Sequence, residues 1–216
     1  MEHQIHNQQK DEKILQQKDI SSKYVVLVNE NDEYIDIEEK HSAHNSMTKL
    51  HRGFSAFLFN EEAKLLLQKR DNSKKTWPDF WSNSVCGHPQ YMEDYEDAVK
   101  RCARFELGIE NIIDLSKISD YRYRFEFNDI VENEICPIYV AKFYGELKIN
   151  PSEVQSTKLL SWDEFIVELD QNKNEFTPWC IDETKIIQTK IQNKMPCDIF
   201  KTPNATTKNT SSIILH

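Results

Sequence analysis

The chain has 216 residues, of which 38% are hydrophobic and 11% aromatic, enough apolar material for one domain with its own core. Its formal net charge of −9 disfavours nucleic acid as a partner, and no apolar run approaches the roughly 18 residues of a membrane helix. Residues 1–20 lack the apolar segment of a signal peptide, and the five cysteines are odd in number and widely spaced. We therefore expect a cytoplasmic protein without a disulfide framework.

The N-terminal part is predicted to contain an arm and two β-hairpins. Residues 1–22 show no hydrophobic period, which is typical of a mobile segment. Residues 24–29 are rich in β-formers and residues 33–38 alternate apolar and polar side chains, so together they predict a hairpin. Residues 51–60 and 64–70 predict a second hairpin.

A long loop and a helix follow. Residues 71–90 carry tryptophans, prolines and a glycine, and they predict a functional loop with one short buried strand. Residues 95–107 have apolar side chains at helical spacing, and Gly108 is a suitable C-terminal stop.

The remaining elements return to strands and end in helices. Residues 121–127 alternate, and residues 135–144 read as one long apolar strand. Residues 158–162 predict a short strand that leads into a helix at 163–170. A last helix is predicted to begin at Thr177-Pro178 and to run to about residue 194.

These elements predict a single folded unit. Residues 196–216 are rich in Thr, Asn and Ser, and we expect them to form a disordered tail. Residues 23–195 predict one α+β domain, a mixed β-sheet sandwiched between helices, with the N-terminal hairpin as an addition.

A spaced motif lies in the middle of the chain. It has the pattern G-x5-E-x7-R-x4-E-x-G-U and consists of Gly87, Glu93, Arg101, Glu106, Gly108 and Ile109. The pattern resembles the Nudix box, a strand–loop–helix unit that holds a metal-bound diphosphate. Cys102 and Phe105 occupy the places of two carboxylates that Nudix hydrolases use. The motif therefore predicts that the protein binds a diphosphate but catalyses a reaction other than ordinary diphosphate hydrolysis.

A second candidate site contains metal donors, namely His44, His51, His88, Glu132 and Glu134. Glu132 and Glu134 are two positions apart in an extended segment, so their side chains point to one face of a strand. Three imidazoles and two carboxylates suit octahedral Mg²⁺, Mn²⁺ or Fe²⁺ better than four-coordinate zinc. The alternative is a set of solvated surface residues, because a chain with seven histidines forms coincidental pairs easily.

Cys86 is a candidate catalytic thiol. It lies in a loop of Gly, Pro and His directly before the predicted diphosphate-binding helix, where functional residues concentrate. The alternative is a small buried side chain, which is the more common role of a free cysteine.

Basic and aromatic side chains complete the candidates. A clamp for an anion could be formed by Lys40, Arg70, Lys74, Lys75 and Arg101, although a lysine pair in a loop is usually just solvated. The large rings are Trp77, Trp81, Tyr123, Trp162 and Trp179. Most of them are expected in the core, but an exposed ring in a dry pocket could stabilise a cationic intermediate.

Together these segments closely resemble type I isopentenyl-diphosphate Δ-isomerases. The most specific are NSVCGHP at 83–89 and ENEICP at 132–137. Others are AHNSMTKLH at 43–51, QKR at 68–70, SKKTWP at 73–78, EDAV at 96–99, YRYR at 121–124 and FTPW at 176–179. The resemblance covers about residues 24–190 in order.

The resemblance implies isomerisation of isopentenyl diphosphate to dimethylallyl diphosphate through a tertiary carbocation, in isoprenoid biosynthesis. It implies that Cys86 acts at one face of the substrate and that Glu134, assisted by Tyr123, acts at the other. It also implies substrate contacts from Lys40, Arg70, Lys74, Arg101 and Trp179.

The resemblance further implies two metal sites. A divalent metal, Mg²⁺, Mn²⁺ or another, would be bound by His44, His51, His88, Glu132 and Glu134. A Mg²⁺ ion that bridges the diphosphate would be held by Glu106 and the main-chain carbonyl of Cys86. Some relatives carry a second arginine directly after the position of Arg101, where this chain has Cys102, so that phosphate contact is not carried over.

Three other classes of function explain less than the isomerase does, and a structural or interaction protein explains none of these motifs. A Nudix hydrolase should keep the glutamates that Cys102 and Phe105 replace. A non-catalytic diphosphate-binding module explains the incomplete box but leaves Cys86, Glu134 and the histidines without a role. We expect an isoprenoid diphosphate as the small-molecule partner, no nucleic acid or membrane partner, and a monomer.

Overall fold

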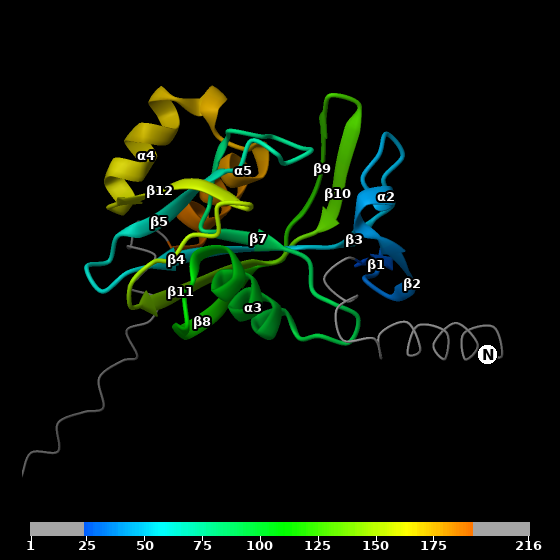
Figure 1. The fold of residues 1–216 in the computed structure, drawn as a ribbon, viewed down its shortest axis with the longest axis horizontal. Helices are drawn as coiled ribbons and strands as arrows, with labels where there is room; N and C mark the ends of the chain where they lie inside the picture. Colours follow the sequence, from blue (N-terminus) through cyan, green and yellow to red (C-terminus); the bar gives the residue numbers. More distant parts are fainter. Residues whose placement is uncertain (1–23, 192–216) are drawn as a thin grey trace, which may run out of the picture.

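A computed structural model describes residues 24–191 (Figure 1). The strands are β1 (Tyr24–Val28), β2 (Tyr34–Glu39), β3 (His51–Arg52), β4 (Phe54–Phe59), β5 (Leu65–Arg70), β6 (Trp81–Ser82), β7 (Val85–Gly87), β8 (Asn111–Ser119), β9 (Arg122–Phe127), β10 (Ile130–Ile135), β11 (Ile138–Tyr144) and β12 (Val154–Leu160). The helices are α2 (Lys40–Ala43), α3 (Tyr95–Leu107), α4 (Trp162–Gln171), the 3₁₀ helix η2 (Lys173–Glu175) and α5 (Pro178–Ile191). The predicted arm 1–22 and tail 196–216 lie outside the described residues.

The strands form two mixed sheets. A five-stranded sheet has the order β2-β1-β3-β10-β9, and its β1–β2 pair is the predicted N-terminal hairpin. A seven-stranded sheet has the order β12-β5-β4-β11-β8, with β6 beside β5 and β7 beside β4. In Figure 1, α3 lies below the seven-stranded sheet, and α4 and α5 lie above it. The predicted α+β class, with sheet between helices, is confirmed.

Two neighbouring strands pass from one sheet to the other at the same place, which we call the strand crossing. β3 pairs in parallel with β10, and β4 pairs in parallel with β11. Only Gly53 separates β3 from β4, and only Cys136 and Pro137 separate β10 from β11. The N–H of Gly53 donates to the carbonyl of Ile135 (2.9 Å), and that of Ser55 donates to the carbonyl of Pro137 (3.1 Å).

The crossing corrects two predictions. The single strands expected at residues 51–60 and 135–144 are each two strands that belong to different sheets. Apolar side chains continue through both breaks, so the hydrophobic pattern does not show them. Pro137 lacks the N–H that a continuous ladder needs. Gly53 leaves space that the neighbouring strand fills with a side chain.

Other elements match the predictions or add to them. The bounds of α3 are those expected, and Gly108 ends the helix in the left-handed conformation, with φ of 69°. The loop 71–90 contains two short strands, β6 and β7, where one was expected. The short helix α2 and the strand β8 were not predicted.

The apolar core lies on both faces of the seven-stranded sheet. Alternate side chains of β4 point to opposite faces of the sheet. Phe57 and Phe59 pack on the side of Phe165 of α4, and Phe54 and Leu58 pack on the side of α3. Every side chain of β4 is buried, as expected of a strand covered by helices on both sides. Within residues 24–191 all of the cysteines are free. In the same range, no helix combines the length and apolarity that a bilayer span requires.

One acidic side chain, Glu183 of α5, is fully buried in this core. Its Oε1 accepts a weak hydrogen bond from the thiol of Cys136 (3.9 Å), and its Oε2 has no hydrogen-bond partner among residues 24–191. Burial raises the pKa of Glu183 well above its ordinary value, a hydrogen bond with Ser55 opposes this, and the charge of Glu134 adds to the rise. Burial therefore favours the protonated acid of Glu183 over its carboxylate.

Replacement of Glu183 by Gln should change how stability depends on pH. The folded chain keeps the proton of Glu183 at pH values where the unfolded chain releases it, so the wild type loses stability as pH rises above the ordinary pKa of 4.5. The free energy of unfolding of Glu183→Gln, minus that of the wild type, should grow by about 1–3 kcal/mol between pH 5 and pH 8. Urea denaturation of both proteins at both pH values measures it. A difference that is constant with pH would show that Glu183 is ionised in the fold.

Candidate active site

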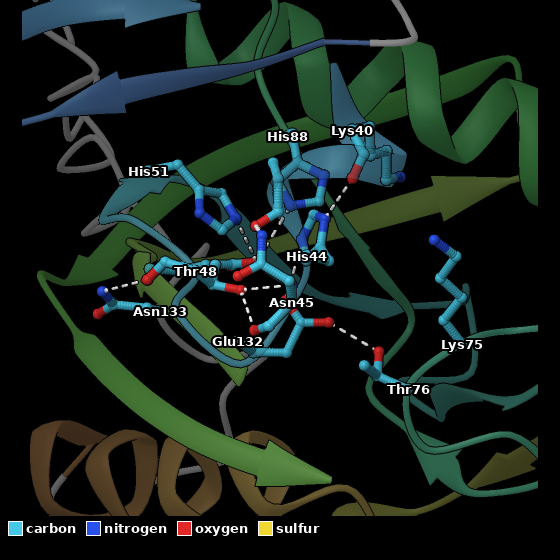
Figure 2. A network of polar contacts seen from close by, with 12 residues as sticks. Lys40, His44, Asn45, Thr48, His51, Lys75, Thr76, His88, Glu132 and Asn133 are labelled. Carbon is cyan, nitrogen blue, oxygen red and sulfur yellow. Dashed lines mark hydrogen bonds and ion pairs between the residues drawn. The ribbon is translucent and has the colours of Figure 1, made fainter. Parts of the chain in front are cut away.

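Three imidazoles lie beside Glu132 of β10 (Figure 2), and those of His51 and His88 face Glu134 of the same strand. His44 follows α2, His51 begins β3 and His88 follows β7. The centroids of the three rings lie 5.0 to 5.5 Å apart. One ligand atom from each histidine and one from Glu134 all lie within 4.8 Å of one another, and Oε2 of Glu132 lies 3.2 Å from Nε2 of His44. The structure therefore brings together the predicted metal donors, which come from the five-stranded sheet and two loops.

Main-chain carbonyls orient two of the imidazoles. Nδ1 of His44 donates to the carbonyl of Lys40 (2.7 Å), and Nδ1 of His51 donates to the carbonyl of Lys49 (2.9 Å). A carbonyl only accepts, so each Nδ1 carries a proton and each Nε2 of the neutral ring carries a lone pair. This is the second-shell arrangement usual for histidines that bind a metal through Nε2.

The Nε2 atoms of the imidazoles face carboxylate oxygens. Nε2 of His51 lies 3.5 Å from Oε1 of Glu134, and Nε2 of His88 lies 3.1 Å from the same oxygen. Within residues 24–191, neither Nε2 of His51 nor Oε2 of Glu132 has a hydrogen-bond partner, and both are buried. Electron-rich atoms at such separations need a cation between them, and the ligands of an ion bound at about 2.1 Å are spaced in this way. The residues fit a divalent metal.

The protonation states agree with this. Burial lowers the pKa of His88 to about 4, although Glu134 opposes the shift. Burial alone would raise the pKa of Glu134, but the adjacent imidazoles of His51 and His88 outweigh it and hold the pKa well below its usual value. A neutral imidazole and an ionised carboxylate are the forms that ligate a metal.

The position of Glu134 depends on the strand crossing. In the register of the five-stranded sheet, Glu134 lies opposite His51 on one side and Tyr123 on the other. A Cβ atom at Gly53 would lie 1.8 Å from Oε2 of Glu134. Only glycine leaves room for this carboxylate.

The thiol of Cys86 is half-buried on the other side of the crossing. Cys86 lies opposite Ser55 of β4, and its Sγ is 3.5 Å from Oγ of Ser55. The thiol donates to Oδ1 of Asn83 (2.9 Å). Burial raises the pKa of Cys86 to about 12. Cys86 is thus held as a neutral thiol.

Trp179 forms the aromatic part of the site. Its indole N–H donates to Oγ of Ser82 (3.2 Å), and that hydroxyl donates to Asn83, the acceptor for Cys86 (2.9 Å). The ring of Trp179 stacks on Tyr123, with centroids 5.8 Å apart and planes at 17°. The guanidinium of Arg70 lies over the Trp179 ring at 5.3 Å.

Glu106 lies near Lys74 and Lys40, two of the predicted diphosphate contacts. It accepts a hydrogen bond from the side-chain amide of Gln68 (3.3 Å). Burial raises the pKa of Glu106, and the charge of Lys74 opposes this. Lys74 itself forms an ion pair with Glu153. On the same helix Cys102 is buried whereas Phe105 is 60% exposed, so neither takes the place of a second metal-binding carboxylate.

Arg101 has a structural role within the motif. Its Nε and Nη2 donate to the two carboxylate oxygens of Glu93 (both 2.7 Å), and Nη2 also donates to the carbonyl of His88 (3.0 Å). This bidentate pair fastens the loop after β7 to α3. A direct contact from Arg101 to a phosphate stays a prediction, as does the contact from Lys40, which is exposed at the start of α2.

Several site residues were missed from the sequence. Ser55, Thr76, Ser82 and Asn83 orient the predicted groups, yet none had been assigned a role. Thr76 and Asn83 lie within the segments SKKTWP and NSVCGHP, and Ser82 directly precedes the second. Their position in these motif segments is the sequence signal that could have identified them. Ser55 follows from strand register, which the sequence does not show.

Comparison with known proteins agrees with this geometry. The NUDIX domain matches residues 49–180. The isopentenyl-diphosphate Δ-isomerase of Enterobacter sp. (strain 638) is 40% identical over 172 residues, which cover 79% of this chain and 93% of that protein. The isopentenyl-diphosphate Δ-isomerase of Citrobacter koseri is 42% identical over 164 residues, which cover 75% of this chain and 90% of that protein.

Solved structures show the same fold at low identity. The structure of DR0079 from Deinococcus radiodurans has a TM-score of 0.58 and 21% identity, covering 77% of this chain and 98% of that one. The MutT protein from Methanosarcina mazei has a TM-score of 0.53 and 17% identity, covering 67% of this chain and 96% of that one. From the matched domain, the relatives and the fold together, the chain belongs to the isopentenyl-diphosphate Δ-isomerase family of NUDIX-domain proteins.

Proposed function

We propose that this chain interconverts isopentenyl diphosphate and dimethylallyl diphosphate. It adds a proton to one carbon of the substrate and removes a proton from a second carbon, and both carbons are bonded to the same central carbon. The carrying observation is that the crossing holds two groups able to exchange protons, one from each sheet. Glu134 pairs with His51 before Gly53, and Cys86 pairs with Ser55 after it. The activity named for the relatives is the one that such a pair serves.

Each group would serve one face of the alkene. One adds a proton to the terminal carbon C4, which leaves positive charge at C3, and the other removes a proton from C2. The acid loses one proton to C4 and the base gains another from C2, so the number of protons on the enzyme is unchanged and no external acid is consumed. Protonation of an unactivated alkene requires that water be kept from the acid, and Glu134 and Tyr123 are 5% and 9% exposed.

The stacked rings of Trp179 and Tyr123 would stabilise the cation. The negative face of an aromatic ring attracts a nearby positive charge most strongly where water is absent. Trp179 is 3% exposed, and its hydrogen bond to Ser82 fixes the plane of the ring.

Two metal sites would support the reaction. The set His44, His51, His88, Glu132 and Glu134 would hold one divalent cation, which when bound supplies positive charge beside Glu134 and strengthens its acidity. Glu106, with the main-chain carbonyl of Cys86, would hold Mg²⁺ on the diphosphate. Lys40, Arg70, Lys74 and Arg101 are the side chains we assign to the phosphate oxygens.

The alternatives explain less. On α3, glutamates at the positions of Cys102 and Phe105 would be needed to build the multi-metal cluster of a Nudix hydrolase. A diphosphate-binding module without catalysis has no use for a half-buried thiol, a buried carboxylate and three converging imidazoles.

Incubation with isopentenyl diphosphate and Mg²⁺ in D₂O tests the proposed function. Dimethylallyl diphosphate should form and should carry deuterium, because the added proton comes from an enzyme group that exchanges with solvent. Mass spectrometry of the product and a phosphate assay on the same samples give the result. Phosphate release that keeps pace with substrate loss would identify a hydrolase instead.

Cys86→Ala and Glu134→Gln should each lower turnover by ~10²-fold or more, the usual scale for a positioned acid or base. Both changes keep the shape of the side chain close to the original, so circular dichroism should show an unchanged fold. Cys180→Ala removes a different thiol, which is fully buried, and is the matched control, with near-normal turnover expected. A Cys86→Ala protein as active as this control would make Cys86 structural.

Gly53→Ala should displace Glu134, which supplies the three atoms nearest to the added Cβ. Since the new Cβ would lie 1.8 Å from Oε2 of Glu134, the carboxylate must move. We expect loss of bound divalent metal, measured by elemental analysis after gel filtration, and turnover reduced by ~10²-fold. Gly145→Ala is the control: it strains a backbone with φ of 100°, but its Cβ meets no heavy atom within 4 Å in the described chain. Full metal content in Gly53→Ala would contradict the position assigned to Glu134.

A further inference from the structure

The hydroxyl of Thr76 makes a buried contact with Glu132. Oγ1 of Thr76 donates to Oε1 of Glu132 at 2.7 Å, and the two side chains point toward each other (Figure 2). Thr76 is 4% exposed and Glu132 is 8% exposed, so no bulk water competes for this contact. Oε2 of Glu132, the oxygen that faces His44, has no hydrogen-bond partner within residues 24–191. The hydroxyl thus occupies one carboxylate oxygen and leaves the other directed at the histidines.

Thr76 belongs to loop 71–80, which also carries predicted diphosphate contacts. The carbonyl of Thr76 accepts from Nη2 of Arg70 (2.9 Å) and more weakly from Nε (3.3 Å), and the carbonyl of Trp77 accepts from Nε (3.1 Å). Nζ of Lys75 donates to the carbonyl of His41 (3.1 Å). These bonds fasten the loop to β5 and α2, so Thr76 joins the loop to the metal donors on β10.

The backbone next to Thr76 is restrained, and this limits the orientation of the hydrogen bond between Thr76 and Glu132. Trp77, directly after Thr76, has a positive φ of 44°, a conformation that a tryptophan adopts only where its surroundings impose it. The hydroxyl of Thr76 therefore has little freedom to follow Glu132 if the carboxylate rotates. Glu132 keeps its hydrogen bond only in the orientation that presents Oε2 to His44.

We propose that Thr76 is a positioning residue that links metal binding at the His/Glu site to the order of loop 71–80. The inference rests on the metal site in the proposed function. A metal that holds Oε2 of Glu132 also holds Oε1 beneath the hydroxyl of Thr76, and this restrains the loop. By thermodynamic reciprocity, a restrained loop strengthens metal binding by the same factor. The diphosphate contacts on Arg70 and Lys74 are then best ordered when the metal is present.

Mn²⁺ titration of the full chain without diphosphate, followed by the electron paramagnetic resonance of free Mn²⁺, tests the link. Thr76→Val keeps the shape of the side chain but leaves Oε1 of Glu132 buried without its donor, and the Kd for Mn²⁺ should rise about 10–100-fold. Thr76→Ser restores the hydroxyl and should return the Kd to within about threefold of the wild type. Ser73→Ala is the matched control in the same loop: Ser73 bonds Asp71 and not the metal donors, so the Kd should not change.

Hydrogen exchange of the amides of residues 71–80 gives a second result that does not depend on activity. Mn²⁺ should slow this exchange in the wild type, Thr76→Ser and Ser73→Ala, and should have no effect in Thr76→Val. If the wild type binds Mn²⁺ and Thr76→Val binds it equally well with the same slowing, the link is overturned and the metal site stands. If His51→Ala binds Mn²⁺ as tightly as the wild type, the metal site itself is wrong.

Discussion

The arrangement of this site depends on hydrogen bonds that keep two parallel strand pairs together while both leave one sheet and enter another. The N–H of Gly53 donates to the carbonyl of Ile135, and the N–H of Ser55 donates to the carbonyl of Pro137. The two neighbouring strands therefore keep their pairing as they pass from one sheet to the other. Residues before the crossing belong to the five-stranded sheet, and residues after it belong to the seven-stranded sheet. The short segment β3–β4 therefore positions both the carboxylate of Glu134 and the thiol of Cys86. A register shift of one residue would move the two groups apart.

A protein of net charge −9 must still attract a diphosphate, and its local cations are already engaged. Arg101 binds Glu93, Lys74 binds Glu153, and Arg70 binds two main-chain carbonyls. These contacts hold the basic groups near the substrate region without leaving a strong field of exposed charge. A bound diphosphate has to share or displace them, which gives metal ions a larger part in the electrostatic attraction.

Sequence reasoning predicted most of the fold where the pattern is local. The period of α3, the glycine that ends it and the two hairpins depend on neighbouring residues, and the structure confirms them. The breaks at Gly53 and Pro137 depend on contacts between distant strands, so a continuous apolar run concealed them. The donor set His44, His51, His88, Glu132 and Glu134 was predicted from its residue types and, above all, from the resemblance to the family, because spacing alone left surface residues as an alternative. Thr76 and Ser55 act through ordinary hydroxyls whose partners only the folded chain reveals.

The acceptors that orient His44 and His51 are main-chain carbonyls, and this bears on how the family can diverge. A side-chain acceptor is lost with one codon change, whereas the carbonyls of Lys40 and Lys49 persist whatever side chain those positions carry. The tautomers of the two imidazoles are therefore protected from most point mutations in their surroundings. Position 49 is therefore free to change its side chain, for example to adjust surface charge, while the geometry of the His51 imidazole is inherited through the backbone.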